Sequence, residues 1–475
     1  MARCFGPGIF SLCLLAMSLN TSAFAGDLTI HGFVTAVNSP TSFAIDDYKI
    51  TRDKALPIDL DNPQGGSSLV TFKPDDIRVG TELEVSGEYD ETSCELKANW
   101  IKVLTYDTVV VQRTALLERL PSLSKDKSGW TGAIYADGER ITVSPMTTVS
   151  LKANRGERMN AGEDKISAAG RFSPDFLNLD TFVHYEGVRQ SDGTIKAQKV
   201  EFEHAFIGNA EARMLRRFTP TVTGPDYANS QPGDLKMGWK TYKTVPSREA
   251  QEYISKLGNR LVPDHQKQLP DNDPRKISFR FFVVENGGFN AVTYPNGVIV
   301  VYSGVFDLLE NEAQLAFVLS HEISHLVEKH AWQQDEYYRS QLIALRAAGV
   351  LMPDALRSGN LRASSISRQY ARTLENQSDR VALEWMLAAG YDIREAPQSW
   401  RAVSKKKPDS LINRFWSTRD NYTSRHSYLM AELRNNYRGV NYSNLKKDSH
   451  DFHHVADLIQ NFENGQKQKT AMAGQ

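Results

Sequence analysis

The stretch QLAFVLSHEISHLVEKH, residues 314–330, places two histidines four residues apart within an apolar segment. Asn311, three residues before this stretch, can cap the helix that follows it, in a capping-box-like arrangement with Gln314. Apolar residues then recur at helical spacing, at Leu315, Val318, Leu319, Ile323 and Leu326. At 3.6 residues per turn, His321 and His325 differ by about 40° in azimuth, so both imidazoles can reach one ion. The segment therefore predicts a largely buried helix that carries a metal site on one side.

Glu322 points about 100° away from His321 on the same helix. It is close enough to reach a water at the ion but poorly placed to be a ligand. This arrangement suits hydrolysis, because two nitrogen ligands hold zinc while the adjacent carboxylate takes the proton from water. The alternative is a core helix with a polar HEISH edge. With 11 histidines in 475 residues, a chance H-E-x-x-H is expected on the order of once in a hundred such sequences.

A catalytic zinc ion needs a third protein ligand and one open position. His330 lies about 180° from His321 on a continuing helix, so we expect it to face away and to be structural. Glu328 lies on the correct face, but the axial rise carries it away from a compact site. Glu375 and Asp379 are four residues apart on a predicted helix and share a face. Glu375 can close the site, and Asp379 can accept the outer N–H of a ligand histidine. The alternative for this pair is a solvated helix edge.

Two segments together resemble a known family. NAVTYPNGVIVVYSGVFDLLENEAQLAFVLSHEISHLVEKH, residues 290–330, and ENQSDRVALEWMLAAGYD, residues 375–392, resemble the HtpX and CAAX-prenyl-protease type of zinc peptidase in its soluble secreted form. The resemblance extends over about residues 240–435. It implies one Zn²⁺ per chain and a peptide-bond hydrolase. It also implies His321 and His325 as ligands, Glu322 as the catalytic base, Glu375 as the third ligand and Asp379 behind the ligands.

The resemblance further implies that the strand at 297–303 is a sheet edge beside the active site, where an extended peptide could add by main-chain hydrogen bonds. The residues expected to bind substrate are Asn290, Ala291, Val298 and Val300. The family commonly has a downstream His-Pro element near an arginine. Here His426 is followed by Ser427, with Arg434 further on. His426 is either a catalytic residue that stabilises the oxyanion or a surface histidine.

The region before the metal site reads as all-β, since residues 27–206 consist of short alternating segments with turn signals. Two pairs of segments repeat at an offset of 99–100 residues, namely 31–37 with 131–137 and 85–103 with 185–202. This repeat predicts two tandem small all-β, barrel-like domains, at 26–106 and 107–207.

The remaining boundaries follow from composition. Residues 1–25 have the pattern of a cleaved secretory signal peptide. Residues 208–243 are rich in proline and glycine and predict an irregular linker. Residues 244–440 predict an α+β, mainly helical metallopeptidase domain of zincin type, followed by a helical and polar C-terminal tail at 441–475. Signal cleavage leaves Cys94 as the single cysteine, which excludes an internal disulfide.

The composition also limits the partners. The net charge is −1, so no global field favours nucleic acid or an anionic membrane, and no later segment predicts a transmembrane span. The sequence predicts a periplasmic or secreted zinc endopeptidase that acts on proteins or peptides in envelope quality control. The alternative is a latent metallo-domain in a chaperone-like scaffold, in which the β-domains recruit an envelope protein partner.

Overall fold

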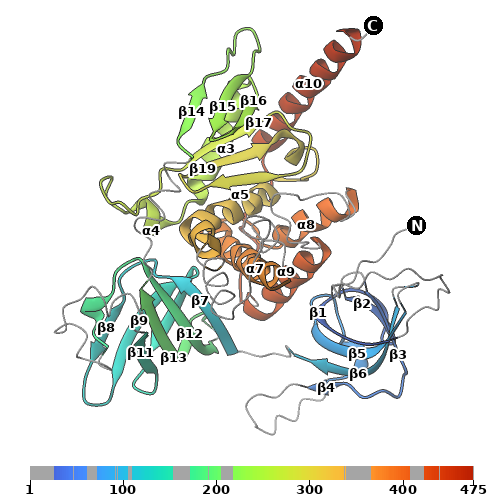
Figure 1. The fold of residues 1–475 in the computed structure, drawn as a ribbon, viewed down its shortest axis with the longest axis vertical. Coiled ribbons are helices and arrows are strands. Elements are labelled where there is room, and N and C mark those ends of the chain that lie inside the picture. The colour runs from blue at the N-terminus through green and yellow to red at the C-terminus, as the bar shows by residue number, and fades with distance from the viewer. Residues whose placement is uncertain are drawn as a thin grey trace, which may run out of the picture.

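The computed structural model is drawn in Figure 1. It describes residues 26–45, 48–60, 72–90, 93, 95–104, 110–152, 172–190, 192–204, 218–335, 337, 365–406, 422–437 and 439–473. The predicted signal peptide at 1–25 and Cys94 lie outside these residues.

The first β-domain contains β1 (Gly26–Ser39), β2 (Ser42–Ile45), β3 (Tyr48–Arg52), β4 (Asp59–Leu60), β5 (Glu82–Asp90) and β6 (Glu95–Val103), with a 3₁₀ turn at Pro74–Asp76. The sheet order is β3-β2-β1-β5-β6-β4, and β3 also pairs with β6. Side chains alternate between core and surface along β5, so that Leu83 and Val85 are fully buried. These strands therefore bury one face in a core of their own.

The second β-domain contains β7 (Val110–Leu116), β8 (Ser122–Lys125), β9 (Trp130–Ala136), β10 (Glu139–Val143), β11 (Thr148–Lys152), β12 (Thr181–Arg189) and β13 (Ile195–His204). Its order is β7-β12-β13-β10-β9-β8, and β11 pairs with β13. Its strands enclose a separate core. The all-β character predicted for this region is confirmed, while its division into domains at 26–106 and 107–207 and their barrel-like character stay predictions.

One of the two sequence matches coincides with equivalent strand pairs. Gly87 lies opposite Ala98 in the β5–β6 pair, and Gly187 lies opposite Ala197 in the β12–β13 pair, each next to a register shift. A Cβ at Gly87 would lie 2.1 Å from the Lys97 carbonyl oxygen, which explains the glycine there. The other match is wrong. Residues 31–37 lie in β1, which pairs with β2 and with β5, whereas 131–136 lie in β9, which pairs with β8 and β10 and, among the described strands, not with β12, the counterpart of β5. Alternating patterns this short recur on many strands, so they do not identify equivalent ones.

The third sheet corrects the predicted linker. It has the order β14-β15-β16-β17-β19-β18, with β14 (Pro220–Thr223), β15 (Gly233–Met237), β16 (Lys240–Thr244), β17 (Arg280–Val284), β18 (Ala291–Tyr294) and β19 (Val298–Tyr302). Three of these strands lie almost wholly within residues 208–243, so the prediction of irregular structure was wrong for the described part of that segment. The prolines and glycines there mark strand ends and the turns between strands.

The same sheet corrects the predicted edge. β19 pairs with β17 on one side and with β18 on the other, so it is an interior strand. Among the described strands, the edge on that side is β18. The error arose because β18 precedes β19 in the chain but lies beyond it in the sheet. β19 makes a parallel pair with β17 on one side. On its other side it forms an antiparallel hairpin with β18.

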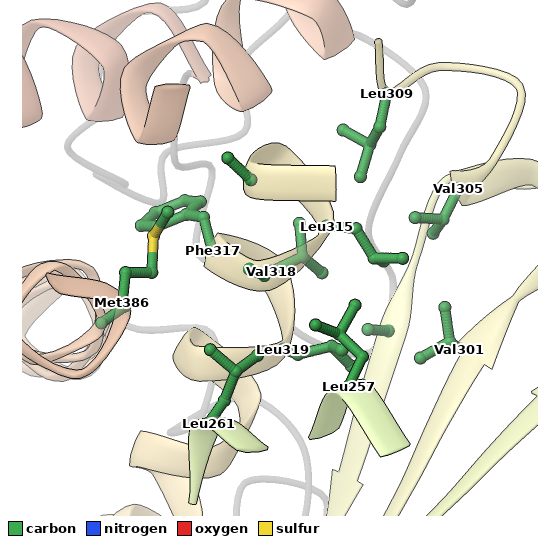
Figure 2. Close-up of a cluster of buried hydrophobic side chains, with 14 of the residues drawn as sticks. Leu257, Leu261, Val301, Val305, Leu309, Leu315, Phe317, Val318, Leu319 and Met386 are labelled. Atoms are coloured by element: carbon green, nitrogen blue, oxygen red, sulfur yellow. The ribbon is translucent and has the colours of Figure 1, made fainter. Parts of the chain in front are cut away.

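The helices cover this sheet and build the main core. They are α3 (Arg248–Leu261), α4 (Asp264–Lys267), α5 (Glu312–Val327), α7 (Ser365–Ala388), α8 (Glu395–Lys406), α9 (Tyr422–Asn436) and α10 (His450–Ala473). Figure 2 shows Leu315, Val318 and Leu319 of α5 between side chains of α3 and β19, with Phe317 directed toward Met386 of α7. Helix α5 is thus held on all sides, and every one of its residues is buried.

The C-terminal segment is more than a polar tail. Phe452, Val455 and Ile459 of α10 are buried in the same core as α3 and α5. The first half of α10 therefore belongs to the α+β domain, which corrects the predicted boundary at 440. No helix within the described part of the chain has the length and apolar character needed to cross a membrane.

Both β-domains contact helix α9. Arg434 donates a hydrogen bond to the Gly80 carbonyl oxygen of the first domain at 2.7 Å, and the rings of Tyr428 and Phe33 meet edge to face. Glu432 forms an ion pair at 3.5 Å with Arg113 of the second domain. Figure 1 shows α5, α7 and α9 between the third sheet and the two β-domains.

Candidate metal centre

Helix α5 sets the two histidines side by side. Its N-cap, Asn311, accepts a hydrogen bond from the Gln314 backbone at 3.0 Å, as the sequence predicts. His321 and His325 follow on one face, 3% and 7% exposed. Their Nε2 atoms lie 3.1 Å apart. Two imidazole nitrogens at this distance can bind one ion.

Helix α7 supplies a carboxylate to the pair. Glu375 Oε2 lies 3.3 Å from His321 Nε2, and Glu375 Oε1 lies 3.6 Å from His325 Nε2. Zinc bonds of about 2.1 Å in a tetrahedron separate ligand atoms by about 3.4 Å. All three ligand atoms lie within 4.8 Å of one another. The donor types and their spacing therefore fit zinc, with the fourth position left for a water or a substrate.

Asp379 lies behind the first histidine. Its Oδ1 is 3.0 Å from His321 Nδ1, so it can accept that N–H and leave the Nε2 lone pair for the metal. The spacing of four residues on α7 brings Glu375 and Asp379 to one face, as expected. Asp379 itself is fully buried, and a buried carboxylate needs compensating donors.

Arg425 of α9 provides those donors, and the sequence analysis missed it. Its Nε and Nη2 donate to the two Asp379 oxygens at 2.8 and 2.5 Å, and its Nη1 lies 3.2 Å from Glu375 Oε2. The guanidinium also stacks over the Trp400 ring, 3.9 Å from the centroid. The available signal was its position directly before His426, in the segment where the family resemblance places an arginine.

His426 is directed elsewhere. Its Nδ1 lies 2.8 Å from the Pro397 carbonyl oxygen, which holds the ring against α8. Burial lowers its pKa below the ordinary value, which favours the neutral ring. Arg434, weighed as its partner, contacts the first β-domain instead. A role for His426 at the oxyanion stays a prediction.

His330 lies next to the metal site. The prediction that it faces away from the site was wrong. The helix ends at Val327 and Lys329 has a φ of 54°, so the azimuth of a continuing helix does not apply. The turn brings His330 Nδ1 to 2.9 Å from His325 Nδ1. Glu328, the other alternative ligand, instead accepts the Leu116 backbone N–H of the second β-domain at 3.2 Å.

Glu322 is held by a strand. Thr293 of β18 places its hydroxyl 2.5 Å from Glu322 Oε2 and 3.0 Å from the Glu322 carbonyl oxygen. Burial raises the pKa of Glu322 above its usual value, although His321 and the Thr293 hydrogen bond oppose the shift. A carboxyl group with a raised pKa is suited to exchange protons near neutral pH.

The charge states of Glu375 and His325 suit metal binding. Burial alone would raise the pKa of Glu375, but its hydrogen bond with His321 and the charge of Arg425 oppose burial, and the pKa lies below its usual value. Burial keeps the pKa of His325 well below its ordinary value, which favours the neutral ring. A charged carboxylate and a neutral imidazole are the ligand forms that zinc requires.

The four residues expected to bind substrate separate into two groups. Val298 and Val300 are fully buried on the face of the sheet opposite α5, in a core with Tyr242 and Tyr294. They are therefore unavailable to a substrate. Asn290 and Ala291 lie at the start of the edge strand, where the Asn290 carbonyl oxygen accepts the Tyr302 N–H at 3.0 Å.

Comparison with known proteins gives matches over this domain. Residues 248–438 match the sequence model of peptidase family M48. A relative named putative beta-barrel assembly-enhancing protease, from Vibrio cholerae, is 27% identical over 243 residues, 46% of this chain and 43% of the relative. The beta-barrel assembly-enhancing protease of Escherichia coli K12 is 29% identical over 31% of each chain. The bovine mitochondrial metalloendopeptidase OMA1 is 30% identical over 27% of each chain. The chain thus spans less than half the length of these relatives.

Proposed function

We propose that this chain, whose residues 248–438 form a metallopeptidase domain of family M48, is a zinc-dependent endopeptidase. The observation that carries the proposal is the buried cluster of His321, His325 and Glu375, with all ligand atoms within 4.8 Å. Glu322, which lies next to the first ligand in the chain, supplies a buried carboxylate that is not part of the ligand set. Three ligands and one separate base are what metal-assisted hydrolysis needs.

A zinc ion bound there would acidify a water molecule and polarise the scissile carbonyl. Glu322 takes the proton from the attacking water and then gives it to the leaving amine. Thr293 holds the Glu322 carboxylate in position through its hydroxyl. Asp379 fixes the His321 tautomer, and Arg425 compensates the buried charges of Asp379 and Glu375.

The substrate backbone pairs with strand β18, the edge of the third sheet among the described strands. The Asn290 carbonyl oxygen bonds to Tyr302 on β19, so in an antiparallel pair the backbone groups of Ala291 and Thr293 point to the open side. The hydrogen bond from the Thr293 side chain to Glu322 supports a position of this edge beside the reacting carbonyl. Recognition through the main chain favours a broad tolerance of substrate side chains.

Metal removal tests the proposed function directly. We expect the purified chain to cleave an unfolded protein such as reduced casein. Dialysis against a zinc chelator should abolish cleavage, and stoichiometric Zn²⁺ should restore it because the ligands remain in place. The measurement is the rate of new amino-terminus formation, with zinc content by elemental analysis. Full activity in the zinc-free chain would contradict the proposal.

Thr293→Val tests the positioning of the base. The substitution keeps the β-branched shape of a strand residue and removes the hydroxyl that bonds Glu322. We expect kcat to fall by about tenfold while zinc content stays unchanged, since a base that is out of position loses part of the 10²–10⁴-fold it contributes. The check is steady-state kinetics beside Thr241→Val, on β16 of the same sheet, as a control. An unchanged kcat would show that Thr293 does not position the catalytic base.

For the biological role, we propose export from the cytoplasm and action on envelope proteins. The signal-like pattern of residues 1–25 and the names of the bacterial relatives support this. A comparison of the exported proteome with and without an inactive variant tests it, since uncleaved envelope proteins should accumulate.

A further inference from the structure

A line of buried hydrogen bonds runs from the metal ligand His325 out of the α+β domain and into the second β-domain. His325 Nδ1 lies 2.9 Å from His330 Nδ1, and His330 Nε2 lies 3.2 Å from Gln377 Oε1. Gln377 Nε2 donates to Asp137 Oδ1 at 2.8 Å. Asp137 occupies the turn between β9 and β10 with a φ of 58°, and it is fully buried.

The direction of each bond in this line is fixed from the Asp137 end. A carboxylate only accepts, so the Gln377 amide must turn its NH₂ to Asp137 and its oxygen to His330. That oxygen requires a proton on His330 Nε2, which leaves His330 Nδ1 as an acceptor. His325 must then carry its proton on Nδ1 and present the Nε2 lone pair to the metal.

We infer that Asp137 of the second β-domain is a positioning residue for the metal site, acting through Gln377 and His330 to hold His325 in its ligand tautomer. The inference rests on the proposed function only for the identity of the ion. It makes the docked β-domain a part of the metal centre, so that separation of the two domains would weaken metal binding.

The other hydrogen bonds of Gln377 and His330 are consistent with these donor and acceptor assignments. Gln377 Nε2 also lies 3.3 Å from the Thr114 carbonyl oxygen and 3.2 Å from Glu328 Oε2, so two of its three acceptors belong to the β-domain. Ser378 Oγ lies 3.2 Å from His330 Nδ1. A hydroxyl can donate or accept, so Ser378 fits either tautomer and does not choose between them.

Asp137→Asn is the sharpest variant, because it changes one acceptor into a donor at constant shape. Asp137 Oδ2 accepts from Arg380 at 2.6 Å and from Tyr185 at 3.2 Å, so an asparagine keeps its oxygen there. Its NH₂ then faces the NH₂ of Gln377. The Gln377 amide relieves this clash by turning over, which presents a donor to His330 and reverses both histidine tautomers. Burial raises the pKa of Glu328 well above its usual value, so its acid form can donate to the turned oxygen.

Two further variants make the test specific. Glu139→Gln is the matched control, since Glu139 is a buried acid of the same interface that pairs with Arg113 and Arg189 but does not contact Gln377. The double variant Asp137→Asn with Gln377→Glu exchanges the amide and the carboxylate. Its glutamate accepts from His330 in either orientation. Its second oxygen then meets Glu328, whose pKa burial raises well above its usual value, so Glu328 can donate as a neutral acid. The ligand tautomer therefore returns at unchanged net charge.

The experiment measures Zn²⁺ affinity of the full chain by competition with a chromophoric chelator, with thermal unfolding as a check on folding. We expect Asp137→Asn to lose about 10- to 100-fold in zinc affinity, the range for groups that orient metal ligands. Glu139→Gln should stay near wild type, and the double variant should recover. Equal zinc affinity of Asp137→Asn and wild type overturns the inference, as does an equal loss in Glu139→Gln or a double variant without recovery.

The readout also separates this inference from the proposed function. A wild-type chain that binds zinc but cleaves no protein would contradict the peptidase proposal and leave the zinc comparison intact. Isotope-labelled histidine provides a second check in the zinc-free chain, because the ring nitrogens report the tautomer. We expect the Nδ1–H form of His325 in wild type and the Nε2–H form in Asp137→Asn.

Discussion

Glu322→Gln should retain zinc and fold while losing about a thousandfold or more in kcat, because one carboxylate serves as both base and acid. An amide neither takes the proton from water nor returns it to the leaving amine. The amide oxygen of the variant can still accept the Thr293 hydroxyl, so the local packing is kept. The measurement is kcat on a peptide substrate, with zinc content and thermal unfolding determined on the same preparation.

The control for this result is the KM. Glu322 is not among the proposed ligands, and the glutamine keeps its size and shape, so we expect substrate binding to change little. Cleavage by Glu322→Gln at the wild-type rate would show that the water is activated by another group. A loss of zinc together with activity would instead assign Glu322 a place among the ligands.

Glu375→Ala should lose zinc, and with it all activity. Its carboxylate lies within 3.6 Å of both ligand nitrogens, and removal leaves two ligands for an ion that needs three from the protein. It also leaves Arg425 Nη1 without the Glu375 oxygen at 3.2 Å, which places an excess positive charge beside the site. Elemental analysis after dialysis gives the zinc content directly.

Glu384→Gln is the matched control on the same helix. Glu384 is buried, but it accepts a hydrogen bond from the Tyr437 hydroxyl at 2.5 Å, away from the histidines. Burial raises its pKa to about 7, so a neutral amide resembles its protonated form and zinc content should stay at the wild-type level. Wild-type zinc content in Glu375→Ala would mean that another group completes the site. Glu328 is poorly placed for this, since it accepts from Leu116 and Gln377.

The sequence by itself determined what depends on helical periodicity. The spacing of His321, Glu322 and His325 defines a face of α5, and the spacing of Glu375 and Asp379 defines a face of α7. Both follow from 3.6 residues per turn, which is a local property of the backbone. The pairing of the two helices came from the chemistry of zinc, whose two histidines call for a third ligand.

Only the tertiary structure decided which groups surround that site. The turn at Lys329 brings His330 back to His325, α9 presents Arg425 rather than His426, and β18 rather than β19 forms the sheet edge. Asp137 reaches the metal centre from 240 residues before Gln377 in the chain. The physical reason is that periodicity fixes which side chains share a face, whereas the direction of a turn, the order of strands and the docking of domains depend on packing between distant segments.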